Sequence, residues 1–389
     1  MNSITTYRFS ALRPQSGFTL VELLVALVIG LALTLALATI TLRSEIGKRV
    51  LTAGNDMAQN TSFITYELDR VLRSAGSGFA QSWSLTAGCP LNVSQNGAQI
   101  LPRLAAFPAP FATVPTAVAM APVLIHAGVG TGGSDVLAVM TGAAGLSEAQ
   151  IRIAPQSATA DSVRIDNTIG SRGNDLVLIA QAAGCMVQQV AAPFNGGPTP
   201  LLGFGGAYAA PVINGLALTS FGAGGAVDVM MSLGNVTGNR PMFQLIGIGP
   251  NATLVSYDLL RLDGTDATPA QAEGIVDIRA VYGFDNTAVP DGTIDAWVVP
   301  TNALYTVAAL TARTAPAQDR LKRIKAVRIG LVLRSDRIEK EAVSPASLTL
   351  FGNVPGVVPY VLTLSSDQQR QRFRIVEFTV PLRNVITVP

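Results

Sequence analysis

The chain has 389 residues, of which 49% are hydrophobic and 13% charged, so it can bury one large core or two modest ones. This composition excludes an intrinsically disordered chain. A formal net charge of only +2 argues against nucleic-acid binding that is driven by the overall charge of the protein. Only residues 18–42 are long and apolar enough to cross a bilayer. Everything after them is therefore expected to be soluble.

The first seventeen residues are basic. They contain Arg8 and Arg13 and no acid, which is typical of the start of a targeting segment. An ordinary secretory signal is cleaved after its apolar run, but the plausible junction here, Gly17 before Phe18, precedes that run. Cleavage there would lower the 27 basic residues to 25, equal to the 25 acidic ones. The mature chain would be formally neutral.

One carboxylate, Glu22, interrupts the apolar run. A charged side chain costs roughly 2 to 3 kcal/mol at the centre of a bilayer on insertion scales. An ordinary membrane anchor gives no reason to accept that cost. Glu22 therefore predicts a compensating protein partner.

The string Gly17-Phe18-Thr19-Leu20-Val21-Glu22, followed by an uninterrupted apolar helix, resembles the class III leader of type IV pilins and type II secretion pseudopilins. The resemblance implies that a prepilin peptidase cleaves after Gly17 and that Phe18 is N-methylated. It also implies that Glu22 helps to dock the incoming subunit. Glu22 lies one helical turn from the new terminus, where it would pair with the N-terminal amine of a neighbouring subunit.

The helix is predicted to continue beyond the membrane. Residues 43–74 contain no proline, and apolar residues recur at helical spacing up to Leu72. We expect the helix to end at about Ala75, where Gly76 and Gly78 supply a stop signal. The expected domains are a leader (1–17), a transmembrane half-helix (18–42), an extramembrane half-helix (43–76) and a β-rich globular head (77–389).

Several segments further along the chain resemble the PilW family of minor pilins, whose pseudopilin counterpart is GspJ. Residues 67–76 resemble the end of its long helix. Residues 135–139 and 175–179 look like its paired strands. Four later segments resemble the closing strands of the PilW family: residues 273–278, 282–285, 326–331 and 378–384. The long Gly- and Pro-rich stretch 194–211 departs from a compact pseudopilin and favours PilW over GspJ.

After Gly76, short apolar runs are broken by Gly, Pro, Asn and Asp, which predicts antiparallel sheet and an α+β fold. Alternation from Val327 to Arg334 predicts a strand with one buried and one wet face. Residues 89–123, 194–211 and 222–225 are interpreted as Gly/Pro-rich surface loops. A short helix over 315–323 would present a basic cluster, interpreted as a solvated or partner-facing surface in preference to a DNA-binding one: Arg320, Lys322, Arg323, Lys325 and Arg328.

The two cysteines, Cys89 and Cys185, form no C-x-x-C motif, which argues against a metal site made by this pair. If the head lies outside the cytoplasm, a disulfide is expected. Two buried thiols are the alternative. A disulfide would stabilise the fold by roughly 4 to 5 kcal/mol in the chain-entropy model.

Three motifs resemble catalytic or binding sites. Residues 128–133 satisfy G-x-G-x-x-G, but a strand rather than a helix is predicted behind them, so we interpret them as a loop. His126 is the only histidine, which excludes most Ser-His-Asp arrangements and histidine clusters. Asp285, Asp291 and Asp295 have the composition of a calcium loop without EF-hand spacing, and a hairpin turn is the alternative. No cofactor and no enzyme activity are expected.

The first hypothesis is thus a minor pilin in the bacterial inner membrane, its head in the periplasm, that later joins a tip complex priming pilus assembly. The expected partners are the prepilin peptidase, other minor pilins, the major pilin and a tip adhesin. A GspJ-like pseudopilin of type II secretion is the second hypothesis. A pilus-displayed adhesin or DNA-uptake receptor is the third, and nucleic acid is not the expected ligand.

Overall fold

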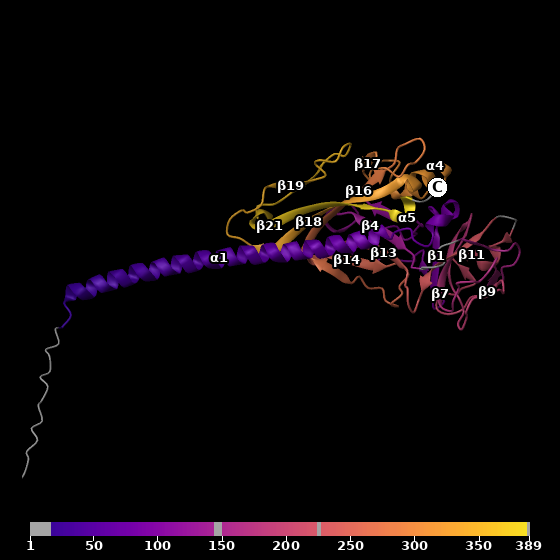
Figure 1. Cartoon of the computed structure of the whole chain (residues 1–389), viewed down its shortest axis with the longest axis horizontal. Helices are drawn as coiled ribbons and strands as arrows, with labels where there is room; N and C mark the ends of the chain where they lie inside the picture. The colour runs from indigo at the N-terminus through magenta and orange to yellow at the C-terminus, as the bar shows by residue number, and fades with distance from the viewer. Residues whose placement is uncertain (1–16, 144–149, 224–226, 387–389) are drawn as a thin grey trace, which may run out of the picture. The chain divides into compact units, whose positions relative to one another are not determined.

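The computed structural model describes residues 17–143, 150–223 and 227–386. The chain divides into two compact units, Met1–Asp56 and Met57–Pro389. Helix α1 (Leu20–Arg73) contributes to both (Figure 1). Leader residues 1–16 lie outside the described residues.

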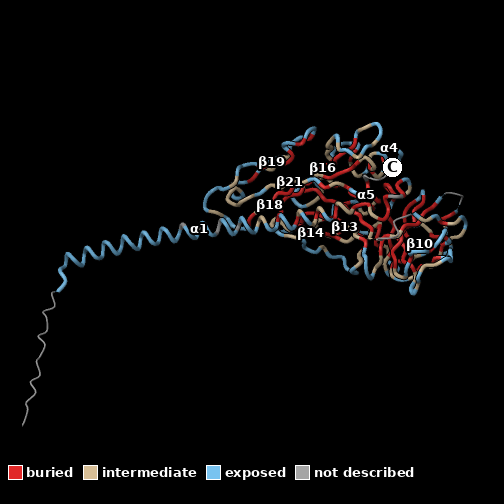
Figure 2. The backbone as a smooth tube through the Cα atoms, viewed as in Figure 1, coloured by how far each residue is buried: buried red, intermediate tan, exposed pale blue. Residues whose placement is uncertain are grey.

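The first unit contains the apolar half of α1. Leu20–Leu42 has a mean hydropathy of 2.7, and none of it is buried within the chain. Figure 2 draws this stretch uniformly as exposed. This is the single apolar N-terminal helix that the sequence predicts. Helix α1 continues without a break through Gly30, Gly47 and Gly54.

The second unit begins with the last part of α1, which is amphipathic. Ile64, Leu68 and Leu72 are buried in the head, whereas Phe63 and Tyr66 are exposed. The spacing of the buried residues is that of one helical face. The helix ends at Arg73, two residues before the expected position, and Gly76 then turns the chain at a φ of 86°.

The head is predominantly antiparallel sheet, as predicted. Three larger sheets occur among the described residues. The six-stranded sheet has the order β2 (Ala98–Leu101), β1 (Leu91–Gln95), β8 (Gly184–Gln189), β7 (Asp175–Gln181), β12 (Val229–Asn235), β5 (Ile151–Arg152). The five-stranded sheet has the order β15 (Ala270–Glu273), β14 (Thr253–Asp258), β13 (Met242–Gly249), β4 (Val136–Thr141), β3 (Val123–His126). The four-stranded sheet has the order β17 (Ala296–Val298), β16 (Ile275–Phe284), β18 (Ile324–Ile338), β21 (Gln371–Pro381).

Smaller elements surround these sheets. The two-stranded pairs are β6 (Ser162–Arg164) with β9 (Leu201–Gly203), β10 (Val212–Ile213) with β11 (Leu216–Ala217), and β19 (Ser347–Leu350) with β20 (Tyr360–Thr363). The short helices are α2 (Trp83–Thr86), α3 (Val307–Leu310), α4 (Ala315–Arg323) and α5 (Arg383–Ile386). The bounds of α4 are those that the sequence predicts. Its N-cap Thr314 accepts a hydrogen bond from the amide of Ala317.

The main core joins α1 to the three larger sheets. Figure 2 shows the buried residues in red within the head. A second cluster covers the other face of the six-stranded sheet and includes Val177, Met186 and Phe204. A third lies between the four-stranded sheet and the connection 339–370, which contains β19 and β20; we call this connection the lobe. Its Leu350 and Phe351 pack with Val332 of β18.

The lobe corrects the prediction for β18. The core face of the strand is buried as expected, but the opposite face is not wet. The lobe covers it so closely that a Cβ at Gly330 would overlap Leu350. Alternation of side chains along a strand cannot reveal a cover that comes from a distant segment.

Two further expectations are wrong. The segments 135–139 and 175–179 are strands, but they are not partners: β4 pairs with β3 and β13, and β7 pairs with β8 and β12. Residues 89–123 are not a surface loop, because they include β1 and β2 and bury Phe111 and Met120 completely. Proline marks breaks in secondary structure, and such breaks can lie within a core.

Candidate functional site

The long helix begins with a capped first turn. The Thr19 hydroxyl accepts a hydrogen bond from the Glu22 amide at 3.3 Å, and the Leu23 amide donates to the Thr19 carbonyl at 3.2 Å. Thr19 is therefore the N-cap, and Thr-x-x-Glu is the sequence of a capping box. This capping signal was legible in the sequence and our prediction did not use it.

The hydroxyl groups of the span are satisfied within the helix. Thr34, Thr39 and Thr41 donate to the carbonyls of Leu31, Ala36 and Leu37 at 2.8 to 2.9 Å. Such internal bonding is what a hydrocarbon environment requires. The Glu22 carboxylate is the exception, because no described side chain pairs with it. It lies in the first turn, near the positive end of the helix dipole.

Phe18 precedes this turn and is 83% exposed. A Cβ added to Gly17 would meet nothing within 4 Å. The residues of the predicted cleavage site thus have no structural role that the described chain reveals. Phe18 and Glu22 lie in one short stretch and are available to other molecules.

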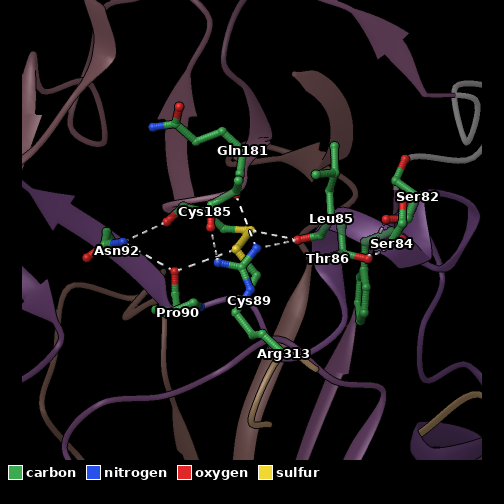
Figure 3. The surroundings of a disulfide bond; sticks show 12 residues. Ser82, Ser84, Leu85, Thr86, Cys89, Pro90, Asn92, Gln181, Cys185 and Arg313 are labelled. Atoms are coloured by element: carbon green, nitrogen blue, oxygen red, sulfur yellow. Dashed lines mark hydrogen bonds between the residues drawn. A yellow bond between two sulfur atoms is a disulfide. The ribbon is translucent and has the colours of Figure 1, made fainter. Parts of the chain in front are cut away.

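The predicted disulfide between Cys89 and Cys185 is present (Figure 3). It joins Cys89, two residues before β1, to Cys185 in β8. Strands β1 and β8 pair in parallel, whereas the other named strand pairs among the described residues are antiparallel. Both cysteines are fully buried, and their sequence separation is 96. The disulfide therefore closes a long loop inside the head.

Arg313 lies beside the disulfide, as Figure 3 shows. Its guanidinium donates to the carbonyls of Ala182 at 2.7 Å, Gln181 at 3.2 Å and Leu85 at 3.4 Å. It thereby ties the β7–β8 turn to the segment that carries α2. The sequence holds no local signal for this role, because the three carbonyls come from distant positions.

The junction between α1 and the head is closed by the other end of the chain. The Asn384 side chain donates to the carbonyls of Ser74 and Ala75 at 3.0 and 3.1 Å, and the Gly76 amide donates to Met140. The Asn384 bonds satisfy the carbonyls of the two residues that follow the last helical residue, Arg73. Residues 378–384 were predicted as a closing strand, but β21 ends at Pro381 and Asn384 instead caps α1.

The glycine-rich motif connects β3 to β4, which confirms the predicted loop followed by a strand. The amide of Gly128 donates to a carboxylate oxygen of Asp135 at 2.9 Å, and β4 follows directly. No helix opens behind the glycines to receive a phosphate. His126 ends β3, and burial lowers its pKa to about 4. It is therefore neutral at pH 7.

The three aspartates of the calcium candidate each accept backbone hydrogen bonds. Asp285 accepts from Thr287 and Gly292, Asp291 from Thr293, and Asp295 from Asn286. Burial acts to raise the pKa of Asp285, but the hydrogen bonds outweigh it and hold the pKa below its usual value. Within the described residues, no group of three or more His, Cys, Asp or Glu is arranged to hold a metal ion. The hydrogen bonds that these carboxylates accept all come from the loop itself.

Three cations of the basic cluster near α4 are bonded to other groups of the chain. Lys325 is buried and donates to the carbonyl of Val385 at 3.1 Å. Arg328 pairs with Glu377 across the sheet, and Arg323 pairs with Asp319. Lys325, Arg323 and Arg328 therefore help to hold the fold together.

The described chain joins an apolar helix, whose first-turn carboxylate has no described partner, to an antiparallel head with one disulfide, an architecture consistent with a pilin. Residues 12–38 match the prokaryotic N-terminal methylation motif, and residues 249–384 match the family of the type IV pilus-assembly protein W, PilW. Neither the curated proteins nor the solved structures contain a match. The two family matches support a type IV pilus minor pilin of the PilW type.

The PilW match has a clear structural extent. It begins at the end of β13 and includes the four-stranded sheet, the lobe and Asn384. The six-stranded sheet and the disulfide lie outside it. PilW-type pilins are a structural, non-enzymatic family, and an apolar helix behind a prepilin leader is consistent with anchorage in the inner membrane.

Proposed function

We propose that this protein is a minor pilin that primes pilus assembly from a tip complex. A prepilin peptidase cleaves it after Gly17, Phe18 is N-methylated, and Glu22 docks the subunit against a neighbour. The observation that carries the proposal is the Glu22 carboxylate, left without a described partner in a span whose threonine hydroxyls are internally bonded. An N-terminal amine of another subunit would supply the missing positive charge.

The part of α1 within the head offers a second contact for neighbouring subunits. Phe63 and Tyr66 are 52% and 64% exposed. They lie three residues apart and therefore share one face of the helix. Large exposed aromatics are typical of contact surfaces. We infer that this face packs against other pilins in the tip complex, with the bulky head at the end of the filament.

The test replaces Glu22 by alanine in cells that assemble pili. Processing and membrane level should match wild type, whereas the amount recovered in sheared pili should fall about tenfold or more, equivalent to about 1.4 kcal/mol or more. Glu45→Ala is the matched control, because Glu45 is an exposed carboxylate on the same helix beyond the candidate span. Wild-type recovery of Glu22→Ala in sheared pili would refute the docking role.

Processing is tested separately with Gly17→Ala. The added methyl group meets no neighbour, so the variant should fold normally. We expect the uncleaved precursor to accumulate in the membrane fraction. Mass spectrometry of wild-type protein should find a methylated N-terminus at Phe18, and an intact leader on wild-type protein from pili would contradict the proposal.

Deletion of the gene separates the pilus from the secretion system. Loss of surface pili and of twitching is expected here. Normal pili together with secreted enzymes trapped in the periplasm would instead identify a GspJ-like pseudopilin. An adhesin or DNA-uptake receptor would leave pilus number unchanged and lower only adhesion or uptake.

A further inference from the structure

Strand β21 forms one edge of the four-stranded sheet. It is eleven residues long and pairs with β18, and no described strand lies on its other side. Figure 1 shows the two strands running together. A long unpaired edge exposes a row of amide and carbonyl groups that another strand can bind.

The hydrogen-bond pattern shows which residues of β21 face outward. The amide of Leu382 donates to the carbonyl of Lys325, and the register from Ala326↔Pro381 to Arg334↔Phe373 is continuous. Because bonded and non-bonded pairs alternate in an antiparallel ladder, the even-numbered residues of β21 bond to β18. The amide and carbonyl groups of residues 375, 377 and 379 therefore point away from β18, towards the unpaired side of β21.

The lobe closes only the beginning of this edge. The Ser344 hydroxyl donates to the carbonyl of Gln371 and accepts from the amide of Phe373. Both are odd-numbered residues, which agrees with the alternation. Beyond Phe373, no described backbone group pairs with the outward side of Ile375–Thr379. We call these five residues the open edge.

The charges beside the open edge favour an acidic occupant. Arg372 pairs with Glu339, but Arg370 donates to a main-chain carbonyl, and the exposed Arg374 has no described side-chain partner. Glu377 is already neutralised by Arg328. The net charge of the side chains beside the open edge is therefore positive. Two copies of this edge would bring the same surplus charge together, which disfavours self-pairing.

Half-buried apolar side chains complete the surface. Val376 and Phe378 pack against the main core but remain partly accessible. They lie on the same face of β21 as Arg374, because side chains alternate along a strand. A strand added at the edge would cover them, and its backbone would pair with the outward amides and carbonyls.

We propose that the open edge receives an extended acidic segment of a different pilin subunit as an additional β-strand. The inference rests on the proposed function, which places this chain in an assembly of several pilins. Main-chain bonding supplies the affinity, and Arg374 supplies the preference for a carboxylate in the incoming segment. Pairing would extend the four-stranded sheet across the boundary between subunits.

The first test is Thr379→Pro in the full chain. Thr379 is exposed and its amide points outward, so proline removes a donor from the open edge without removing a bond to β18. The matched control is Thr379→Ala, which retains the amide. We expect about tenfold less Thr379→Pro than Thr379→Ala in complexes with other pilins, and equal recovery of the two would overturn the proposal.

A second measurement does not depend on proline being tolerated. Both native cysteines are in the disulfide, so Thr379→Cys introduces the only free thiol. After labelling with a thiol-reactive photocrosslinker in cells, it should capture another pilin through an acidic segment. Thr363→Cys, at an exposed position on β20, is the control and should capture at least about tenfold less, equivalent to about 1.4 kcal/mol.

The outcomes are distinguishable. Capture of no subunit, or of a second copy of this chain alone, by a chain that is present in sheared pili would overturn the edge pairing and leave the proposed function intact. Absence of the wild-type chain from sheared pili would overturn the proposed function and this inference together. Arg374→Glu should lower capture at residue 379, and unchanged capture would refute the acidic character of the occupant.

Discussion

The two units of the chain use apolar residues in opposite ways. Leu20–Leu42 buries none of its apolar surface within the chain, whereas the head closes three apolar clusters over its sheets. The head can therefore be stable by itself, but the span requires lipid or neighbouring helices. A single sequence thus combines a self-sufficient domain with an element that is complete only in an assembly.

The largest expected effect is the loss of stability of the head when the disulfide is removed. Replacing both Cys89 and Cys185 by alanine should destabilise the head by about 4 to 5 kcal/mol, because the bond closes a loop of 96 residues. Urea unfolding in detergent, monitored by tryptophan fluorescence, measures the loss. Membrane insertion of the variant should match wild type, and a defect in insertion would contradict the independence of the two units.

A matched pair of leucines sharpens the comparison. Leu72→Ala removes a fully buried side chain and should cost about 2 to 5 kcal/mol of unfolding free energy. Leu33→Ala makes the same chemical change at a position that is 60% exposed, and should leave the urea midpoint unchanged. Equal losses for the two variants would break the proposed division of the helix.

Acidification tests burial in the head through its single histidine. The pKa of His126 is about 4 in the folded protein, whereas an unfolded histidine titrates near 6.5. The contribution of neutral His126 to the free energy of unfolding is therefore present above about pH 6.5 and is lost as the pH falls towards 4. The contribution lost between pH 7 and pH 5 should be about 2 kcal/mol. His126→Gln should remove that part of the pH dependence, and the same slope in both proteins would show that other groups cause it.

The smallest expected effect concerns the junction of α1 with the head. Asn384→Ala leaves the carbonyls of Ser74 and Ala75 without their side-chain donor and should cost about 1 kcal/mol. Hydrogen exchange should increase in the last turn of α1 and remain unchanged in β7 and β8. Arg383→Ala, one residue earlier, is a suitable control because no described hydrogen bond or ion pair involves its side chain. Uniformly faster exchange would indicate global destabilisation instead.

Where the signal is local, the sequence predicted the structure well. The apolar run predicts a helix, because in an unbroken helix without proline the backbone amides and carbonyls hydrogen-bond to one another. The N-cap Thr314, followed by Pro316 near the start of α4, makes a short helix from Ala315 to Arg323 equally legible. The disulfide needed no choice of partner, since the chain has only two cysteines.

Long-range pairing could not be predicted in the same way. The segments that form β4 and β7 have similar apolar patterns, but only the tertiary structure assigns them to different sheets. The burial of both faces of β18 depends on the lobe, and the role of Arg313 depends on carbonyls from distant segments. Periodicity reports the environment of a segment and carries no information about which neighbour provides it.

The sequence by itself determined the leader motif, the apolar helix with Glu22, the β-rich character of the head and the cysteine pair. All of these follow from composition and spacing within short stretches of chain. Only the tertiary structure decided that Asn384 caps α1, that the lobe covers β18, and that β21 keeps an open edge. Those features arise from contacts between residues far apart in the chain, where the free energy depends on packing and hydrogen-bond geometry.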